Sequence, residues 1–317
     1  MKPSAAILSV GNEVLRGSVV NTNAAFLGRE LSSVGFEVVS HGVCADSQEA
    51  IRFRLGEFLR RVDLLVMMGG LGPTPDDVTR DGIAAYFKVP LVFSPQQYAQ
   101  LKKVYKKYGK RVPLLVKREA MYPENAKPLI NRFGIALGFS IEVQQKLVIV
   151  LPGVPSELEN MYTDVVLPVL RKKFTGLQKT RKLIVRTTGI SEPDVMKKLG
   201  PDFFDDPFDF GIYPSAGEVA VRILAENTAI LGRLKKKITD RLKDGIYAWD
   251  ETPLVAVIGK ILTKKKKTLA VAESCTGGLL ASRITALSGA SAFFRGATVA
   301  YHPLVKTKLG VAGELIR

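Results

Sequence analysis

Apolar and polar stretches alternate along the first half of the chain in a way that predicts strands and helices in turn. The runs Ala5 to Val10 and Val62 to Met68 are almost wholly apolar, as expected of parallel strands covered on both faces. Between them, Ser47 is a good N-cap for a helix whose apolar residues fall on one stripe. Strands that alternate with helices imply right-handed crossovers and a mostly parallel sheet. We therefore predict a three-layer α/β domain over residues 1–170.

The pattern changes after this domain. Lys182 to Thr188 predicts a strand, and two further strand-like runs, Phe210–Tyr213 and Glu218–Ile223, flank a Pro-Ser-Ala-Gly turn, which is a hairpin signal. A basic amphipathic helix is predicted from about Thr228 to Leu242. This order of elements, β-α-β-β-α, suits a small α/β domain that packs by itself. The chain then divides into three predicted domains, 1–170, 171–252 and a partial α/β domain at 253–317.

Composition places the chain among ordinary soluble proteins. Of the 317 residues, 46% are hydrophobic and 24% are charged, and no apolar run reaches the length of roughly 18 residues that a membrane span needs. Cys44 and Cys275 form no disulfide or metal pattern, and with only His41 and His302 a zinc site built on His and Cys is not expected. We expect a protein of the reducing cytoplasm, with no membrane attachment.

The net charge of +16 changes the picture only slightly. Lysines and arginines gather at 101–118, 232–243 and 264–267, where they could attract phosphate groups. The alternative is that they form solvated helix faces, because apolar residues recur among them at helical spacing. We favour the second interpretation. No aromatic RNA-binding signature or zinc finger accompanies the charge, so we do not expect a nucleic-acid partner.

A glycine-rich segment follows the predicted strand at 62–68. Glycines let backbone N–H groups approach phosphate oxygens, and Thr74 and Thr79 can donate hydroxyl hydrogens. Asp76 and Asp77 would repel a bare phosphate, so their presence indicates a divalent cation between carboxylate and phosphate. The alternative is a helix-capping turn in which one of the two aspartates is the cap.

Two more acids are predicted at the same edge of the sheet. Glu13 lies in the loop after the first strand, where it could bind a metal or act as a general base, although an exposed loop glutamate is the simpler alternative. Asp46 follows the second strand. Because the carboxyl ends of parallel strands meet at one edge, acids from three loops are expected to converge there.

Three segments of the sequence carry a family resemblance. They read SVGNEVLRGSVVNTNAAFLGREL, GGLGPTPDDVTRD and LPGVPSELENMY. Together they resemble the CinA (competence/damage-inducible protein A) family, whose first domain is similar to the molybdopterin-binding domain of the MoaB/MogA group. TTGISE and YPSAGEVAVRI extend the resemblance into the middle domain.

The resemblance implies an activity for the first domain. It implies a metal-dependent pyrophosphatase that acts on the small-molecule nucleotide ADP-ribose, with cobalt, magnesium or manganese as the divalent ion, in a homodimer. Asp76 and Asp77 would be the metal ligands, with Glu13 and Asp46 as supporting acids. The residues that would hold the pyrophosphate and the metal are Gly69, Gly70, Gly72, Thr74, Asp76 and Asp77. The metal would neutralise the diphosphate and lower the pKa of the attacking water.

A last constellation, ESCTGG, links a predicted strand to a helix. Ser274 could be a nucleophile only if a neighbouring group takes its proton, and the alternative is a helix N-cap. The resemblance implies the start of a nicotinamide-nucleotide amidohydrolase (NMN deamidase) domain, with Tyr301 and Lys306 as the assisting residues. Because the family's deamidase domain is longer than residues 253–317, we expect no deamidase activity from this chain.

The leading hypothesis is therefore a hydrolase of pyridine-nucleotide recycling that cleaves ADP-ribose. A first alternative is a protein that binds or transfers a phosphorylated pterin with the same glycine loop. A second is a DNA-associated competence accessory protein, which a steep salt dependence of DNA binding would favour.

Overall fold

The structure is a computed structural model that describes residues 2–178 and 180–316. It separates into two units with their own cores, Met1–Thr180 and Arg181–Arg317. The first unit continues beyond the predicted boundary at residue 170: helix α7 (Leu167–Lys173) crosses this boundary, and Phe174 and Leu177 after it still pack against the core of the unit. Each unit is described by itself below.

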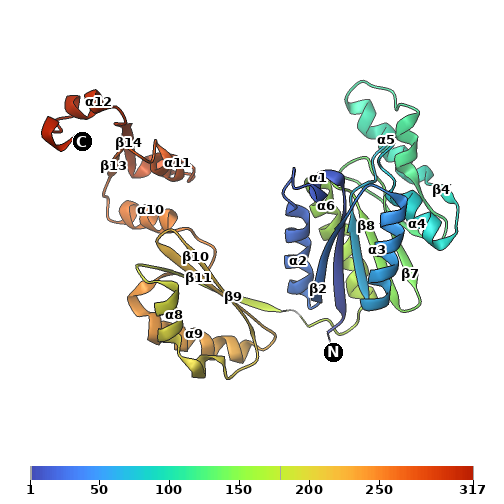
Figure 1. Ribbon diagram of the computed structural model, residues 1–317, viewed down its shortest axis with the longest axis horizontal. Helices are drawn as coiled ribbons and strands as arrows, with labels where there is room; N and C mark the ends of the chain where they lie inside the picture. The colour runs from blue at the N-terminus through green and yellow to red at the C-terminus, as the bar shows by residue number, and fades with distance from the viewer. Residues whose placement is uncertain (1, 179, 317) are drawn as a thin grey trace. The chain divides into compact units, whose positions relative to one another are not determined.

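A six-stranded sheet forms the centre of the first unit as described, in the order β2-β1-β3-β8-β7-β6 (Figure 1). The strands are β1 (Ser4–Val10), β2 (Glu37–Cys44), β3 (Leu64–Met68), β6 (Lys127–Leu129), β7 (Gly138–Val143) and β8 (Lys146–Leu151). The pairs β1–β2, β1–β3 and β3–β8 are parallel, whereas β7 runs antiparallel to both of its neighbours. The prediction of a mostly parallel sheet is confirmed.

Helices cover both faces of this sheet, which confirms the three layers. Leu27 of α2 (Thr22–Val34) and Leu158 of α6 (Pro155–Met161) pack with Ile7 on one face. On the other face, Leu55 of α3 (Gln48–Arg61) and Ile83 of α4 (Thr79–Phe87) pack with Leu8. Neighbouring residues of β1 thus point to opposite cores, and burial of each such side chain contributes about 1.5–3 kcal/mol.

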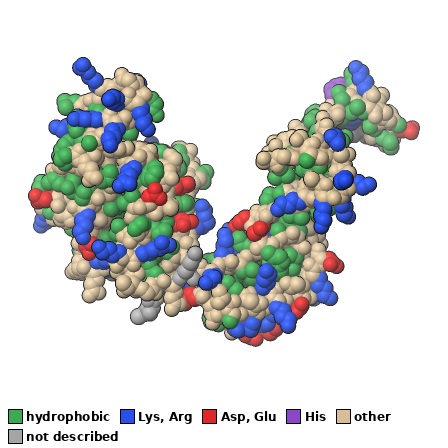
Figure 2. All heavy atoms as spheres, turned by 180° about the vertical axis from the view of Figure 1, so that it is seen from behind, with side chains coloured by type: hydrophobic (Ala, Val, Ile, Leu, Met, Phe, Trp, Pro, Cys, Tyr) green, Lys and Arg blue, Asp and Glu red, His purple; other side chains and the backbone are tan. Residues whose placement is uncertain are grey.

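The remaining elements of the first unit connect the strands and helices of these layers or extend from them. α1 (Asn12–Leu15) is a single turn after β1, where the sequence predicted a loop. The segment between α4 and β6 forms an excursion with its own small apolar cluster around Leu101. Exposed lysines cover the excursion, and Figure 2 shows basic side chains gathered there. Its elements are β4 (Leu91–Phe93), α5 (Pro95–Lys107), η1 (Leu115–Ala120) and β5 (Met121–Pro123), and the π-helical turn η2 (Tyr162–Val166) joins α6 to α7.

The second unit begins with a four-stranded antiparallel sheet in the order β10-β11-β9-β12. Val221 of β11 and Leu234 of α9 are fully buried in the core that the sheet forms with its helices. The predicted order β-α-β-β-α is confirmed, and a short fourth strand follows it. The elements are β9 (Arg181–Thr188), α8 (Glu192–Leu199), η3 (Pro201–Phe204), β10 (Asp209–Ser215), β11 (Glu218–Ala225), α9 (Thr228–Leu242), η4 (Lys243–Gly245) and β12 (Ile246–Ala248).

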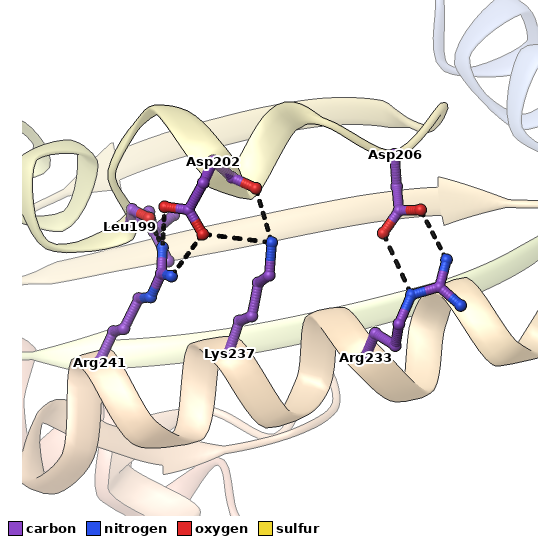
Figure 3. A network of polar contacts seen from close by, with 6 residues as sticks. All are labelled: Leu199, Asp202, Asp206, Arg233, Lys237 and Arg241. Carbon is purple, nitrogen blue, oxygen red and sulfur yellow. Dashed lines mark hydrogen bonds and ion pairs between the residues drawn. The ribbon is translucent and has the colours of Figure 1, made fainter.

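Figure 3 shows what the basic residues of α9 do. Arg233, Lys237 and Arg241 are spaced one helical turn apart and face acids at and just after η3. Arg233 Nη2 lies 2.6 Å from Asp206 Oδ1, and Arg241 Nη2 lies 2.6 Å from Asp202 Oδ2. Lys237 Nζ donates to the backbone oxygen of Asp202 at 2.6 Å. On this helix, the cations thus pair with acids of the same unit.

The last segment carries a two-stranded parallel sheet and a small apolar cluster around Phe293. Just before it, Glu251 pairs with two residues of the antiparallel sheet: Glu251 Oε1 lies 3.3 Å from Lys182 Nζ and 3.4 Å from Arg222 Nη2. Among the described residues, no helix is both long and apolar enough to cross a membrane. The elements are α10 (Leu254–Lys264), β13 (Leu269–Glu273), α11 (Leu279–Thr285), η5 (Ala290–Ala292), β14 (Phe294–Val299), α12 (Pro303–Lys308) and η6 (Gly313–Leu315).

Candidate functional site

A cleft of about 460 Å³ opens at the carboxyl ends of β1, β3 and β8, where open α/β sheets bind ligands. The glycine loop after β3 forms part of its wall, and so does the turn at Gly153 after β8. None of the described residues that line the cleft is a lysine or an arginine. Its acidic lining residues are Glu13, Asp46, Asp76, Asp77, Glu119 and Glu157.

The glycine loop needs its glycines for geometric reasons. Gly69 and Gly70 have φ angles of +95° and +63°, in the left-handed region that other residues rarely adopt. A Cβ atom on Gly69 would fall on the carbonyl oxygen of Val10, and one on Gly70 would fall on the hydroxyl of Thr79. Gly69 therefore lets the end of β3 approach the backbone of β1, and Gly70 lets it approach the first residue of α4.

Two buried side chains hold this loop from behind. The hydroxyl of Thr79 donates to the carbonyl oxygen of Gly69 at 2.8 Å, and its side chain is fully buried. Thr79 therefore does not offer its hydroxyl to the cleft, and the phosphate-binding role predicted from the sequence does not match this placement. Arg80, also fully buried, donates to the carbonyl oxygens of Leu71 and, at 3.1 Å, of Gly72. Burial lowers the pKa of Arg80 to about 10.

Asp76 and Asp77 are oriented by Thr74. The hydroxyl of Thr74 lies 2.5 Å from Asp76 Oδ1 and 2.5 Å from Asp77 Oδ2, and its backbone N–H donates to Asp77 Oδ2 at 2.9 Å. The hydrogen bond from Thr74 lowers the pKa of Asp76. Helix α4 begins later, with Val78 as N-cap and no side-chain cap, so the alternative that an aspartate caps this helix is wrong.

Acids from the neighbouring strand ends meet these aspartates, as predicted. Asp46 accepts a hydrogen bond from the backbone N–H of Asn12 at 2.7 Å. Burial raises the pKa of Asp46, the hydrogen bond from Asn12 opposes this, and the negative charges of Glu13, Asp76 and Asp77 raise it further. This mutual repulsion places the four carboxyl groups in one electrostatic environment.

Sequence reasoning missed two acids of the cleft. Glu157, in the first turn of α6, accepts a hydrogen bond from Asn131 Nδ2 at 2.5 Å, and burial raises its pKa. Glu119, in η1, is fully buried, and its pKa is raised to about 7, mainly by desolvation. Glu119 stood out poorly in the sequence because it ends a long basic run, and Glu157 because it resembles an ordinary acid near a helix N-terminus.

The donors in the cleft suit a hard divalent cation, because carboxylate and backbone oxygens are what magnesium and similar ions prefer. Across residues 2–178 and 180–316, however, no group of three His, Cys, Asp or Glu side chains is arranged to hold a metal by itself. A cation that keeps several waters and takes one or two carboxylates plus phosphate oxygens from the ligand fits this arrangement. Asp76 and Asp77 remain the predicted protein ligands.

The predicted serine site lies in the second unit. Ser274 follows β13 and Tyr301 follows β14, and these strands are parallel neighbours, so both residues leave the same end of the small sheet. Tyr301 is 72% exposed, Lys306 lies in α12, and no hydrogen bond to the hydroxyl of Ser274 is present within the described part of the chain. The alternative of a helix N-cap is wrong, because α11 begins at Leu279 with Gly278 as N-cap.

The acid beside this serine has a structural role. Glu273 is buried and accepts hydrogen bonds from Thr276 Oγ1 at 2.7 Å and from the backbone N–H groups of Leu280 and Ala281 at 2.9 and 2.8 Å. Burial raises the pKa of Glu273, but these hydrogen bonds outweigh it, so that the pKa is lowered overall. Glu273 thus satisfies the first turn of α11 and holds the ESCTGG turn in place.

Comparison with known families gives one match in each unit. A family described as "Probable molybdopterin binding domain" matches residues 6–172, and one described as "CinA C-terminal domain" matches residues 251–317. Among solved structures, the protein CinA from Thermoplasma acidophilum is 36% identical, with 53% of this chain and 98% of that chain covered and a TM-score of 0.49. MoaB from Thermus thermophilus is 24% identical, covers 54% of this chain and 92% of that chain, and has a TM-score of 0.36.

Two curated relatives cover nearly the whole chain. A competence-damage inducible protein of Clostridium botulinum is 36% identical over 305 residues, which make up 94% of this chain and 74% of the relative. That of Clostridium acetobutylicum is 36% identical over 319 residues, 98% of this chain and 77% of the relative. The chain therefore belongs to the CinA family of competence-damage inducible proteins, with a molybdopterin-binding-type domain as its first unit.

Proposed function

We propose that the first unit is a metal-dependent hydrolase of pyridine-nucleotide recycling, which cleaves the pyrophosphate of ADP-ribose. One observation carries the proposal: a glycine loop that lets backbone approach a phosphate lies in a cleft lined by six acids and by no described lysine or arginine. Most phosphate sites balance the ligand's charge with Lys or Arg, and this one lacks them. A cation supplied with the ligand is therefore part of the proposal.

The electrostatics of the loop support a cation in this site. Two like unit charges 4 Å apart repel by about 4 kcal/mol at the effective dielectric constant near a protein surface. Asp76 and Asp77 alone would exclude a bare diphosphate from the glycine loop. With a divalent ion between them, the same carboxylates become attractive, and the selectivity is for the metal complex of a diphosphate rather than for a free anion.

The residues divide the chemical work as follows. Gly69 and Gly70 allow a phosphate to approach the backbone, and Asp76 and Asp77 would hold the ion, oriented by Thr74. When bound, the ion withdraws charge from the diphosphate and lowers the pKa of the attacking water. Asp46, which lines the same cleft, would accept the proton of that water. The water oxygen adds to one phosphorus, the bond from that phosphorus to the bridging oxygen breaks, and AMP and ribose phosphate leave.

The proposal is tested by product analysis. Purified protein is incubated with ADP-ribose and with cobalt, magnesium or manganese, and AMP is measured against a sample treated with a chelator. Release of AMP and ribose phosphate that depends on the added metal supports the proposal. Equal rates with metal and with chelator would show that the carboxylates do not work through a cation.

A phosphorylated pterin is the second candidate ligand. The family that matches residues 6–172 is described by molybdopterin binding, and the same glycine loop could hold a pterin phosphate. In that case the protein would bind the pterin without hydrolysing ADP-ribose. Tight pterin binding, with no AMP release under any of the three metals, would favour this candidate. A homodimer located in the cytoplasm remains a prediction under either function.

A further inference from the structure

Among the acids of the cleft, Glu119 has unpaired carboxyl oxygens that a bound ligand could satisfy. Its side chain is fully buried, it forms part of the cleft wall, and neither carboxyl oxygen has a hydrogen-bond partner among the described residues. Asp46 and Glu157, by contrast, accept hydrogen bonds from Asn12 and Asn131. Buried polar atoms are rarely left without a partner, and those that are tend to have a functional reason.

The charges around Glu119 narrow the kind of partner. Arg80 of α4 is close enough to lower its pKa, whereas Glu157 of α6 and Asp77 of the glycine loop raise it. The neighbouring Arg118 is paired with Asp81. Desolvation is the largest effect and raises the pKa of Glu119 to about 7. Near neutral pH, therefore, the neutral and the charged form of this side chain are both present.

This environment disfavours charged partners. A phosphate would face the carboxylate of Glu119 in a cleft that is already acidic. A metal ion bound to Glu119, in addition to the one at Asp76 and Asp77, would be repelled by the buried guanidinium of Arg80, which donates to the glycine loop at Gly72. The partners that remain possible are neutral hydrogen-bond donors. The two unpaired oxygens of the carboxylate can each accept one hydrogen bond from a pair of donors on adjacent atoms. The vicinal hydroxyls of a ribose have this arrangement, and acidic side chains that bind ribose hydroxyls are a recurring device in nucleotide sites.

We propose that Glu119 recognises the sugar of the ligand, its two carboxylate oxygens accepting hydrogen bonds from the vicinal hydroxyls of a ribose. The inference rests on the proposed function only in taking the ligand to be a nucleoside diphosphate. Donation by the hydroxyls stabilises the charged form of Glu119, so binding near neutral pH releases a proton from this residue. A role as hydrogen-bond donor would instead take a proton up.

The test compares ADP with 2′,3′-dideoxy-ADP, which lacks the two hydroxyls, in binding to the full chain with magnesium. We expect ADP to bind on the order of tenfold more tightly, the usual effect of hydrogen bonds to a charged group. Glu119→Ala should remove the preference while leaving the affinity for the dideoxy nucleotide nearly unchanged. Glu119→Gln keeps the volume of the side chain and one acceptor oxygen, so it should retain part of the preference for ADP. Glu124→Gln is the matched control, because Glu124 is an exposed acid outside the cleft lining.

Calorimetry near neutral pH, in two buffers of different ionisation enthalpy, measures the proton. We expect release with ADP, and less release with the dideoxy nucleotide or with Glu119→Gln. Equal affinity of the wild-type chain for both nucleotides overturns the inference, and so does binding of neither. Hydrolysis of ADP-ribose is scored separately. AMP release without a preference for the diol supports the proposed function and contradicts the role of Glu119. A preference for the diol without AMP release supports the role of Glu119 and contradicts the proposed function.

Discussion

The hydroxyl of Thr79 donates to the carbonyl oxygen of Gly69 across 2.8 Å, and this bond ties the start of α4 to the end of β3. The backbone N–H of Thr79 also donates to the carbonyl oxygen of Gly70 at 3.1 Å. Both contacts are made inside the first unit, behind the wall of the cleft. They hold Gly69 and Gly70, both at positive φ, in the lining of the cleft. Thr79 thus supports the loop, whereas Asp76 and Asp77 are the proposed ligands of the ion.

Removal of the Thr79 hydroxyl should therefore weaken the loop. Thr79→Val keeps the shape of the side chain but leaves the buried carbonyl oxygen of Gly69 without its side-chain donor, at a cost of about 1–3 kcal/mol. We expect a lower midpoint of urea unfolding and reduced ADP-ribose turnover. Thr79→Ser restores the donor and should recover most of both quantities. A Thr79→Val protein with unchanged stability and turnover would contradict the supporting role.

Gly70 should not tolerate a side chain. In Gly70→Ala the new Cβ would fall on the hydroxyl of Thr79, in a backbone conformation with φ of +63°. We expect a loss of about 2 kcal/mol or more in the free energy of unfolding. Gly232→Ala is the matched control, because Gly232 lies in α9 with nothing within 4 Å of a Cβ atom. That substitution should be neutral or stabilise by up to about 1 kcal/mol.

The burial of Glu119 predicts a pH dependence of stability. Its pKa rises from 4.5 to about 7 on folding. Between these values the folded state binds more protons than the unfolded state, so this residue's contribution to the free energy of unfolding falls as pH rises from about 4.5 to about 7. Glu119→Gln should flatten the profile in this window, measured by urea unfolding at several pH values.

The pKa of Glu142 is shifted in the opposite direction from that of Glu119. The hydrogen bonds from Lys127 and Lys173 lower its pKa to about 2. Its contribution to stability is therefore present above the unfolded value of 4.5 and is lost as pH falls below it. Glu142→Gln should change the profile only on the acid side. If Glu119→Gln leaves the slope between about pH 4.5 and 7 untouched, the burial argument for Glu119 is wrong.

The serine of the second unit should be silent in a deamidase assay. Ser274 receives no activating hydrogen bond within residues 180–316, and Tyr301, its predicted assistant, is 72% exposed. A serine hydroxyl needs such a base to attack an amide. We expect no ammonia release from NMN by the wild-type chain, and the same background for Ser274→Ala. Ammonia release that Ser274→Ala abolishes would contradict this prediction.

The fold was predictable from the sequence where a run of neighbouring residues carries the hydrophobic pattern of one element. Buried strands such as β3 and β8 read as apolar runs. Asp46 follows β2, and Asp76 and Asp77 follow β3. Because both strands are parallel to β1, their carboxyl ends share one edge, which made the convergence of these acids predictable. Strand β12 escaped prediction because three residues carry no usable periodicity.

The site was less predictable, because side-chain direction depends on tertiary contacts. Thr79 was expected to face the ligand, but α4 begins at that residue, which turns its hydroxyl toward Gly69. Glu119 lies among basic and apolar residues with no motif, and only the fold brings it to the cleft wall beside Arg80. Burial without a partner is invisible in a sequence, and it is the property that makes Glu119 informative.

The most direct test of the account is the release of AMP from ADP-ribose by the wild-type chain and by two aspartate variants, with magnesium, manganese or cobalt. Asp77 lines the cleft, whereas Asp164 is exposed in η2 and outside the cleft lining. We predict metal-dependent AMP release by the wild-type chain and by Asp164→Asn, and a loss on the order of a hundredfold or more in Asp77→Asn. No AMP release by a folded wild-type chain, or full activity in Asp77→Asn, would contradict the account.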